Sequence, residues 1–328
     1  MSENLIAFDI GESQIKLVWY AGGMRKKAVS VSMPDNLVAN GEIISMDAMA
    51  DYLKDVSKAN GIPRAKAALI LPDSLVFTRN VSVPAMTDAQ LSYNLPYEFK
   101  DYLNQEKSEY YFDYAVQELV KNDQDAVSEM KLFACATLKK TIADYRDMFR
   151  RAGFHLKSAI PEEAAYTALL EERREEGTDT CFVDIGYSAI RMQFFRGASF
   201  MTKRTVNLGM CDLVLSISEA HGVDSHMAYE YMLKNYEDSL NAPASQTLYR
   251  SMAVEIMKAV NFYNYNNREQ MLSRIYLCGG GAALEQIRNA IAEMSDIEIR
   301  SAAELLPEDT AMEEPWIFVK AIGCALQA

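Results

Sequence analysis

Two distant stretches of the chain share one hydrophobic pattern. In the first, the apolar run Leu5 to Phe8 ends at Asp9-Ile10-Gly11, and apolar residues resume from Ile15 to Tyr20. A glycine turn between short apolar runs predicts a β-hairpin. In the second, the apolar run Cys181 to Val183 ends at Asp184-Ile185-Gly186, and apolar and polar residues then alternate. FDIGESQIK and VDIGYSAIR share Asp, Ile, Gly, Ser and Ile in register, which predicts two lobes built on one plan.

Helical periodicity and turn residues predict further elements around these hairpins. Helices are expected after Ser45, from a capping box at Thr87 to Pro96, from Thr141 to a stop at Gly153, from Pro161, across much of 210–268, after the glycines 279–281, and from Pro315 to Leu326. Strands are expected at 110–119, 130–138 and 274–278. The predicted fold class is therefore α/β.

Composition suits a globular protein with two cores and excludes some partners. The chain has 328 residues, of which 49% are hydrophobic and 24% charged, so each of two lobes can bury its own interior. The net charge of -13 argues against nucleic acid as a partner, because binding to a phosphate backbone needs clustered Lys and Arg. We interpret the acidity as a solubilising surface.

The cysteines and the apolar runs indicate the cellular compartment that the chain fits. Five widely spaced cysteines without a CxxC pair suggest neither a disulfide framework nor a zinc site, and they fit a reducing cytosol. The N-terminus lacks the pattern of a secretory signal, and no run of roughly 18 apolar residues predicts a membrane span. Any role at a membrane is therefore expected to pass through a partner.

The two Asp-Ile-Gly turns are candidate phosphate cradles. Successive N–H groups of a tight turn point into a concavity that suits an anion, and Gly11 permits a positive φ and a close approach. A carboxylate at the base of each turn, Asp9 or Asp184, can hold Mg²⁺ through water. Two such turns facing each other across a cleft would bracket the phosphates of a nucleotide and share one metal ion. Each turn taken alone is more typical of a plain β-hairpin.

Two further features are candidates for contact with a nucleoside. Gly279, Gly280 and Gly281 lie between a predicted strand and a predicted helix, where residues without Cβ let a base or ribose lie against the backbone. The run is neither a P-loop nor a GxGxxG motif, and a flexible loop is the alternative. Glu255 and Lys258 share a helix face and are candidates for ribose or adenine contact, with a surface ion pair as the alternative.

Two Asp-Ile-Gly turns, a helical insert and a Gly-Gly-Gly run, in this order, resemble the phosphate-1, phosphate-2 and adenosine motifs of the actin-like ATPases. Within that superfamily, LPDSLVFTRNVSVPAMTDAQLSYNLPYEF and YLCGGGAALEQI resemble the type IV pilus assembly PilM family, which is similar to the division protein FtsA. The resemblance covers essentially the whole chain. It implies an actin-like (ribonuclease H-like) duplicated fold with two lobes and a small inserted α/β domain, and ATP with Mg²⁺ as ligands.

The resemblance also implies a domain division and a set of site residues. The segments are 1–76 for the first lobe, 77–153 for an inserted domain that is a candidate for partner binding, 154–177 for the first lobe again, 178–300 for the second lobe, and 301–328 for a return to the first. The implied nucleotide-binding residues are Asp9, Gly11, Glu12, Ser13, Gln14, Lys16, Asp184, Gly186, Tyr187, Ser188, Glu255, Lys258, Gly279, Gly280 and Gly281, with Asp9 and Asp184 as metal ligands.

The function implied is that of a cytoplasmic ATP-binding scaffold, a weak ATPase at most, whose lobe closure is set by Mg-nucleotide. It would bind the cytoplasmic N-terminal peptide of a PilN-like membrane protein and so lie at the inner face of the membrane without inserting. Other pilus platform proteins and self-association are further partners that the resemblance allows. FtsA carries a membrane-binding amphipathic helix beyond a linker, whereas this chain stops at the helix 315–326, which favours the pilus family.

Three departures from the family pattern keep alternatives open. Glu12 stands where a small residue is usual, Tyr187 is bulkier than usual, and Ile190 replaces a polar residue. A nucleotide-free adaptor of the same fold is therefore one alternative. An FtsA-like division protein and a small-molecule phosphotransferase are others. The aromatic residues between 110 and 114 are candidates for a peptide-binding edge, with strand core as the alternative.

Overall fold

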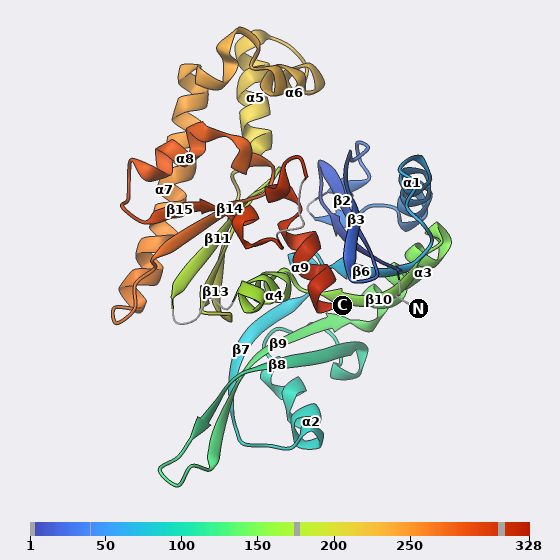
Figure 1. Cartoon of the computed structure of the whole chain (residues 1–328), viewed down its shortest axis with the longest axis vertical. Helices are drawn as coiled ribbons and strands as arrows, with labels where there is room; N and C mark the ends of the chain where they lie inside the picture. Colours follow the sequence, from blue (N-terminus) through green and yellow to red (C-terminus); the bar gives the residue numbers. More distant parts are fainter. Residues whose placement is uncertain (1–3, 40, 174–177, 308–311) are drawn as a thin grey trace. The chain divides into compact units, whose positions relative to one another are not determined.

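The computed structural model describes residues 4–39, 41–173, 178–307 and 312–328. The chain forms two compact units, Met1–Ala168 with Lys320–Ala328 and Leu169–Val319, called here the first and the second unit. Each unit is built on a five-stranded sheet flanked by helices (Figure 1). The predicted α/β class is confirmed.

The sheet of the first unit has the order β10-β6-β1-β2-β3. Strands β1, β2 and β3 pair antiparallel, and β6 and β10 add parallel to β1. The bounds are β1 Asn4–Ile10, β2 Gln14–Ala21, β3 Met24–Ser32, β6 Lys66–Ile70 and β10 His155–Ile160, with a small ladder of β4 Val38–Ala39 and β5 Glu42–Ile43 beside them.

Alternate residues of β1 pack into two different hydrophobic cores. Ile6 and Phe8 point to the face covered by α1 (Met46–Ala59) and α3 (Lys139–Ala152), where Phe8 packs edge-on against Phe149 at a centroid distance of 4.9 Å. Ala7 points to the other face and packs with residues of α4 (Glu162–Arg173) and α9 (Val319–Gln327). This period of two is the normal consequence of strand pleating. The small side chain of Ala7 lets these two helices approach closely.

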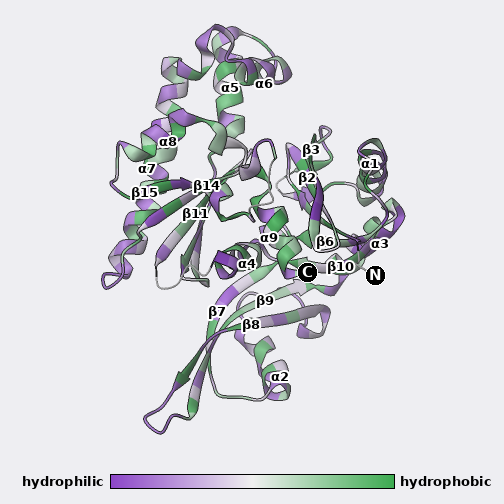
Figure 2. Ribbon diagram, in the orientation of Figure 1, coloured by the Kyte–Doolittle hydropathy of each residue, from purple (hydrophilic) through white to green (hydrophobic). Residues whose placement is uncertain are grey.

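A three-stranded sheet with the order β7-β9-β8 carries its own small core. Its strands are β7 Phe77–Pro84, β8 Tyr110–Lys121 and β9 Val127–Leu138, and α2 (Asp88–Glu98) packs on it through Leu91 and Leu95. The predicted capping box at Thr87 is confirmed, since Thr87 and Gln90 make both reciprocal contacts. The helix ends two residues after Pro96. Figure 2 shows the polar tip that joins β8 to β9.

The second unit repeats the plan of the first. Its sheet has the order β13-β12-β11-β14-β15, with three antiparallel strands followed by two parallel ones. The strands are β11 Asp179–Ile185, β12 Ile190–Arg196, β13 Ser199–Val206, β14 Arg274–Cys278 and β15 Glu298–Ser301. The helices are α5 Met210–His221, α6 Ser225–Lys234, α7 Pro243–Asn266 and α8 Glu285–Ala292. The duplication predicted from the two hairpins is thus confirmed strand by strand.

The helix predicted after the glycine run is confirmed: the run enters a 3-10 turn, Gly280–Ala283, and α8 begins at Glu285, in keeping with the poor helix propensity of glycine. The helix predicted from Pro315 was wrong at its start, because Pro315–Ile317 is a 3-10 turn and the last helix begins at Val319. No described helix is both long enough and apolar enough to cross a bilayer.

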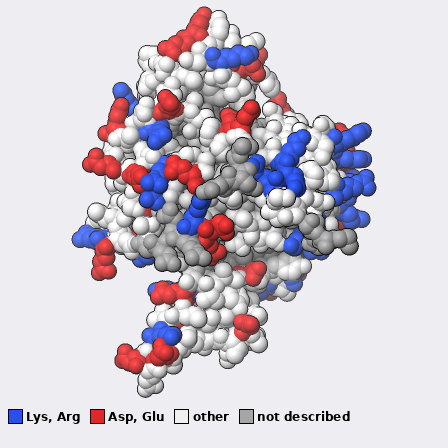
Figure 3. Space-filling model, viewed as in Figure 1, with Lys and Arg blue, Asp and Glu red and all other residues white. Residues whose placement is uncertain are grey.

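Charged side chains are distributed unevenly over the surface. On the face shown in Figure 3, Asp and Glu side chains are spread in small groups, whereas Lys and Arg side chains gather at the edge of the first unit near α1 and α3. Spread acidic groups keep a protein soluble, which agrees with our interpretation of the net charge.

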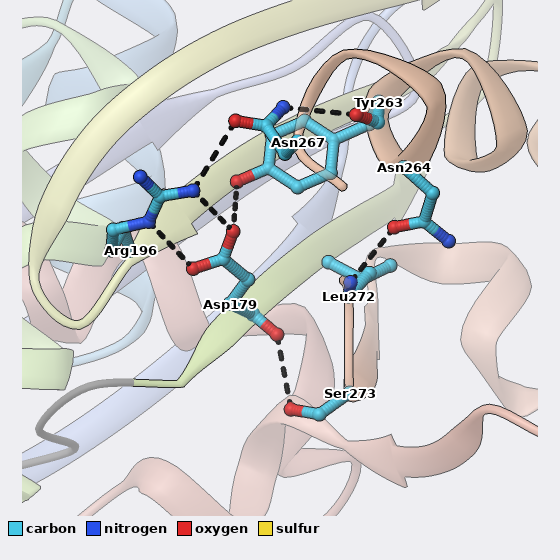
Figure 4. Close-up of polar contacts among 7 residues, drawn as sticks. All are labelled: Asp179, Arg196, Tyr263, Asn264, Asn267, Leu272 and Ser273. Atoms are coloured by element: carbon cyan, nitrogen blue, oxygen red, sulfur yellow. Dashed lines mark hydrogen bonds and ion pairs between the residues drawn. The ribbon is translucent and has the colours of Figure 1, made fainter. Parts of the chain in front are cut away.

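A buried carboxylate at the start of β11 joins the sheet of the second unit to α7 (Figure 4). Asp179 has no exposed side-chain surface and accepts two hydrogen bonds of 3.0 Å from Arg196 and one of 2.5 Å from Tyr263. Burial, followed by the hydrogen bond with Asp179, raises the pKa of the Tyr263 phenol. Ser273, just before β14, donates its hydroxyl to the Asp179 carbonyl at 3.1 Å. One side chain therefore links two strands and a helix.

Asp179→Asn is expected to lower the free energy of unfolding by roughly 2 kcal/mol, because a neutral amide at this buried position cannot accept all three hydrogen bonds that the carboxylate accepts from Arg196 and Tyr263. Asp147→Asn is the matched control, since Asp147 forms an exposed pair with Arg150 at 3.2 Å and such pairs contribute under about 1 kcal/mol. Urea denaturation of the two variants measures both values. Equal stability of the two variants would contradict the structural role given to Asp179.

Candidate functional site

The first turn is closed by a hydrogen bond that leaves no room for a side chain. Gly11 N donates to Gln14 O at 3.0 Å, and a Cβ on Gly11 would stand 2.9 Å from that oxygen. Asp9 pairs across the hairpin with Lys16. The Lys16 ammonium folds back over the turn, 3.4 Å from the place of a Gly11 Cβ. The backbone of the turn and the Lys16 ammonium thus lie together at the same end of the hairpin.

The second turn has the same geometry. Gly186 N donates to Ala189 O at 3.0 Å, and a Cβ on Gly186 would stand 2.9 Å from that oxygen. Asp184 pairs with Arg191, whose guanidinium lies 3.5 Å from the place of that Cβ. Neither Gly11 nor Gly186 has a positive φ, so the expectation of positive φ at Gly11 was wrong. Close approach of backbone is what requires glycine at both positions.

Lysine ammonium groups neutralise the carboxylate at the base of the first turn. Asp9 is 5% exposed, and its two oxygens lie 3.9 Å from Lys16 Nζ and 3.8 Å from Lys320 Nζ. Lys320 also lies 3.3 Å from Glu162, the first residue of α4. Burial and the nearby Asp9 charge raise the pKa of the Cys324 thiol, which keeps this neighbour protonated. Each Asp9 oxygen thus faces one ammonium group, beyond hydrogen-bond distance.

The Glu12 side chain bonds to a second loop of the first unit. Its carboxylate accepts a hydrogen bond of 2.7 Å from the amide of Gly41, a residue with φ of +77°. The Ser13 carbonyl accepts from Met33 N at 2.9 Å, and the Gln14 side chain accepts from Ser30 at 3.1 Å. These side-chain and backbone contacts fix the turn to the rest of the first unit. The Glu12 carboxylate is thereby used to tie two loops together.

In the second unit, the aspartate packs against the glycine run. Asp184 is 4% exposed, and a Cβ on Gly279, which has φ of +83°, would overlap its Oδ1. A Cβ on Gly281 would overlap Ile185, whereas one on Gly280 would meet nothing within 4 Å. Gly279 and Gly281 are therefore packing positions. Gly280 is the member of the run that faces open space.

The turn at Tyr187 is fastened to the start of α5. Met210 N donates to Gly186 O at 3.1 Å and Cys211 N donates to Tyr187 O at 2.8 Å. The first amides of a helix have no partner within it, and here two of them hold the turn in place. Tyr187 also packs against the apolar core of the unit, which accounts for its bulk.

A polar pocket of about 360 Å³ lies between α7 and α8. Residues from the first half of α7 and from α8 line it, among them Gln246, Arg250, Gln286 and Asn289. Glu255 and Lys258 are not among its lining residues, and their side chains form an ion pair of 2.6 Å. Their contact with a nucleoside stays a prediction. Sequence reasoning missed this pocket because it depends on how two separate helices pack.

The aromatic residues at the start of β8 divide by strand face. Tyr110 is 3% exposed and Phe112 packs on the core of the small sheet, which confirms the strand-core alternative for these two. Tyr111 is 48% exposed, and the Lys139 ammonium lies 5.6 Å from its ring centre.

The other predicted site residues lie in two different units. The structure brings Asp9, Gly11 and Lys16 together in the first unit, and Asp184, Gly186 and Gly279 together in the second. A shared metal ion between Asp9 and Asp184 stays a prediction. Among the described residues, no group of three or more His, Cys, Asp or Glu side chains is arranged to hold a metal. The sequence analysis missed Lys320 and Glu162, although Pro161-Glu162 at a helix start was a visible signal.

The duplicated sheets and their paired Asp-Ile-Gly turns define the class of actin-like ATPase folds, and solved structures confirm this class. A chain of a PilM–PilN type IV pilus biogenesis complex superposes with a TM-score of 0.82 at 20% identity, over 98% of both chains. The ethanolamine utilization protein EutJ from Carboxydothermus hydrogenoformans gives 0.64 at 13% identity, over 100% of this chain and 90% of that one. MreB5 of Spiroplasma citri, solved with ADP bound, gives 0.55 at 10% identity, over 99% and 95%.

The particular family follows from the sequence itself. Residues 7–305 match the family of the type IV pilus assembly protein PilM, and the chain therefore belongs to it. The resemblance identified from the glycine motifs is confirmed. Among curated proteins, no relative matches the sequence.

Gly279→Ala is expected to destabilise the second unit by at least about 2 kcal/mol, because alanine at a positive φ is strained and its Cβ would also overlap Asp184. Gly280→Ala is the matched control in the same run, where a Cβ meets open space and the change should stay within about 0.5 kcal/mol. Chemical denaturation followed by circular dichroism separates the two. A Gly279→Ala variant as stable as the control would show that the packing described for Asp184 is wrong.

Proposed function

We propose that this chain is an ATP-binding scaffold of type IV pilus assembly. The observation that carries the proposal is the pair of turns with matching geometry, each with a glycine amide bonded to a carbonyl three residues on and a basic side chain folded over it. Membership of the PilM family supplies the pilus context. The reaction, if any, would be weak ATP hydrolysis.

The proposed nucleotide contacts combine the two units. Phosphates would lie against the amides of residues 11–14 and 186–188, close to Lys16 and Arg191, because amide nests with a nearby cation bind anions well. The nucleoside would lie against Gly280, with Gly279 and Gly281 shaping the backbone around it. Nucleotide held by both units would bias their closure, and closure would bias partner binding.

The proposed partner is the cytoplasmic N-terminal tail of a PilN-like membrane protein. The support is the family and the similarity in fold to a chain of a PilM–PilN complex. Through such a partner, a cytoplasmic chain would lie at the inner face of the membrane without entering it. Contact with further platform proteins and self-association fit the same role.

A second candidate function is a nucleotide-free adaptor of the same fold. The observation that favours it is the neutralised Asp9 carboxylate, since a site already balanced by two ammonium groups has less need of a bound metal–phosphate group. The adaptor would keep the partner contact and lack the ATP response. Ligand binding to the purified chain distinguishes the two candidates.

ATP at a hundredfold excess over its Kd is expected to stabilise the wild-type chain by about 2.7 kcal/mol, which a thermal shift measures. Gly280→Val should fold like the wild type and lose most of this gain, because its side chain would fill the place proposed for the nucleoside. Ser251→Val, at an exposed position of α7, should keep the gain. An unchanged melting curve with millimolar ATP would support the adaptor.

The chain is expected to co-purify with a membrane protein that has one span and a short cytoplasmic N-terminal tail. Deletion of that tail should abolish recovery, because the tail is the proposed contact. A tail of the same length and composition in scrambled order is the control and should also fail to bind. Recovery of the tailless protein would refute this mode of binding.

A further inference from the structure

Four charged side chains meet in the interior of the first unit. Asp9 from β1, Lys16 from β2, Glu162 from α4 and Lys320 from α9 have side-chain exposures of 7%, 15%, 9% and 14%. Each Asp9 oxygen has its own lysine, with Oδ2 facing Lys16 at 3.9 Å and Oδ1 facing Lys320 at 3.8 Å. Two acidic and two basic groups balance, which is what buried charges require.

Close helix packing puts Lys320 in this position. A Cβ on Gly323 would overlap the carbonyl of Ala165, so α9 and α4 touch backbone to backbone at that point. Lys320 lies one turn before Gly323, and Glu162 lies one turn before Ala165. The same packing that requires glycine therefore sets the Lys320–Glu162 contact, which is 3.3 Å long.

An ammonium and a divalent cation compete for the same place beside these carboxylates. Mg²⁺ takes oxygen ligands at short range and keeps several waters, whereas an ammonium donates hydrogen bonds and offers no lone pair. A metal ion at Asp9 and Glu162 would stand next to Lys320 and be repelled by it. Glu163, the next residue, is 1% exposed, and its Oε1 accepts a hydrogen bond of 2.7 Å from Thr78.

We propose that the Lys320 ammonium is a built-in counter-ion that takes the place of a divalent cation beside Asp9 and Glu162. The first unit then holds its phosphate turn in a charge-balanced state without metal. A further consequence rests on the proposed function: stabilisation by ATP does not depend on Mg²⁺. This assigns to Lys320 a binding role that the turn motifs by themselves do not contain.

The experiment is a titration of the full chain with Mn²⁺. Binding is measured as a decrease in the EPR signal of free Mn²⁺. Lys320→Met keeps the length of the side chain and removes the charge, and it is expected to bind one Mn²⁺ at least about tenfold more tightly than the wild type. Lys320→Arg keeps the charge and should behave as the wild type does. Adding Asp9→Asn to Lys320→Met should remove the new site, which locates it.

Two outcomes would overturn the proposal. One is a Mn²⁺ ion that the wild type binds and that Asp9→Asn alone abolishes. The other is a folded Lys320→Met variant, verified by circular dichroism, that binds Mn²⁺ no better than the wild type. If the Lys320→Met variant does not fold, Lys320→Gln is used in its place. The comparison of Mn²⁺ binding by the wild type and by Asp9→Asn requires no substitution at Lys320.

The ATP consequence is tested separately by thermal shifts in MgCl2 and in EDTA at matched ionic strength. Equal rises in melting temperature with ATP in the two buffers support the Lys320 proposal. A rise that requires Mg²⁺ overturns that proposal while leaving nucleotide binding intact. If ATP gives no gain in either buffer, the proposed nucleotide function fails. The Mn²⁺ titration still decides the role of Lys320 in that case.

Discussion

The close approach of backbone at each Asp-Ile-Gly turn is the constraint on which the rest of the structure depends. In both units a glycine amide bonds to the carbonyl three residues later at 3.0 Å, and the space beside it excludes any side chain. This contact sets the register in which Asp9 opposes Lys16 and Asp184 opposes Arg191. The parallel strands and helices that follow then add to a hairpin whose polar edge is already fixed. An insertion or a bulky residue at either glycine would therefore change the charge arrangement as well as the turn.

The two turns have the same backbone, but different elements pack on their aspartates. Asp9 receives a second ammonium from α9, a helix from the far end of the chain, whereas Asp184 packs against Gly279 within its own unit. A buried carboxylate needs compensation, and this can come from a fixed cation or from a bound ligand. In the first unit, part of this compensation comes from Lys320 of α9. Duplication of the fold thus preserved the backbone geometry of the turn, while the element that packs on the aspartate differs between the two units.

Features encoded by neighbouring residues were predictable from the sequence. The two hairpins, the capping box at Thr87 and the stop at Gly153, which adopts φ of +96°, all rest on contacts within a few residues. The glycine run was found, but its 3-10 turn was not, because only packing against Asp184 and Ile185 explains it. The Lys320 contacts and the pocket between α7 and α8 depend on helices that are distant in sequence. No periodicity or spacing carries that information.

These observations separate the fold from the chemistry associated with it. An actin-like fold supplies two amide-lined turns by topology alone, and a family member can keep those turns for reasons of packing. Whether such turns recruit a metal depends on side chains supplied by other helices, and Lys320 shows that one residue on α9 is enough to change the charge seen by Asp9. In a scaffold, a permanently neutral turn has a physical advantage over a metal-dependent one. Under the Lys320 proposal, the stability of the first unit does not vary with the concentration of a free cation.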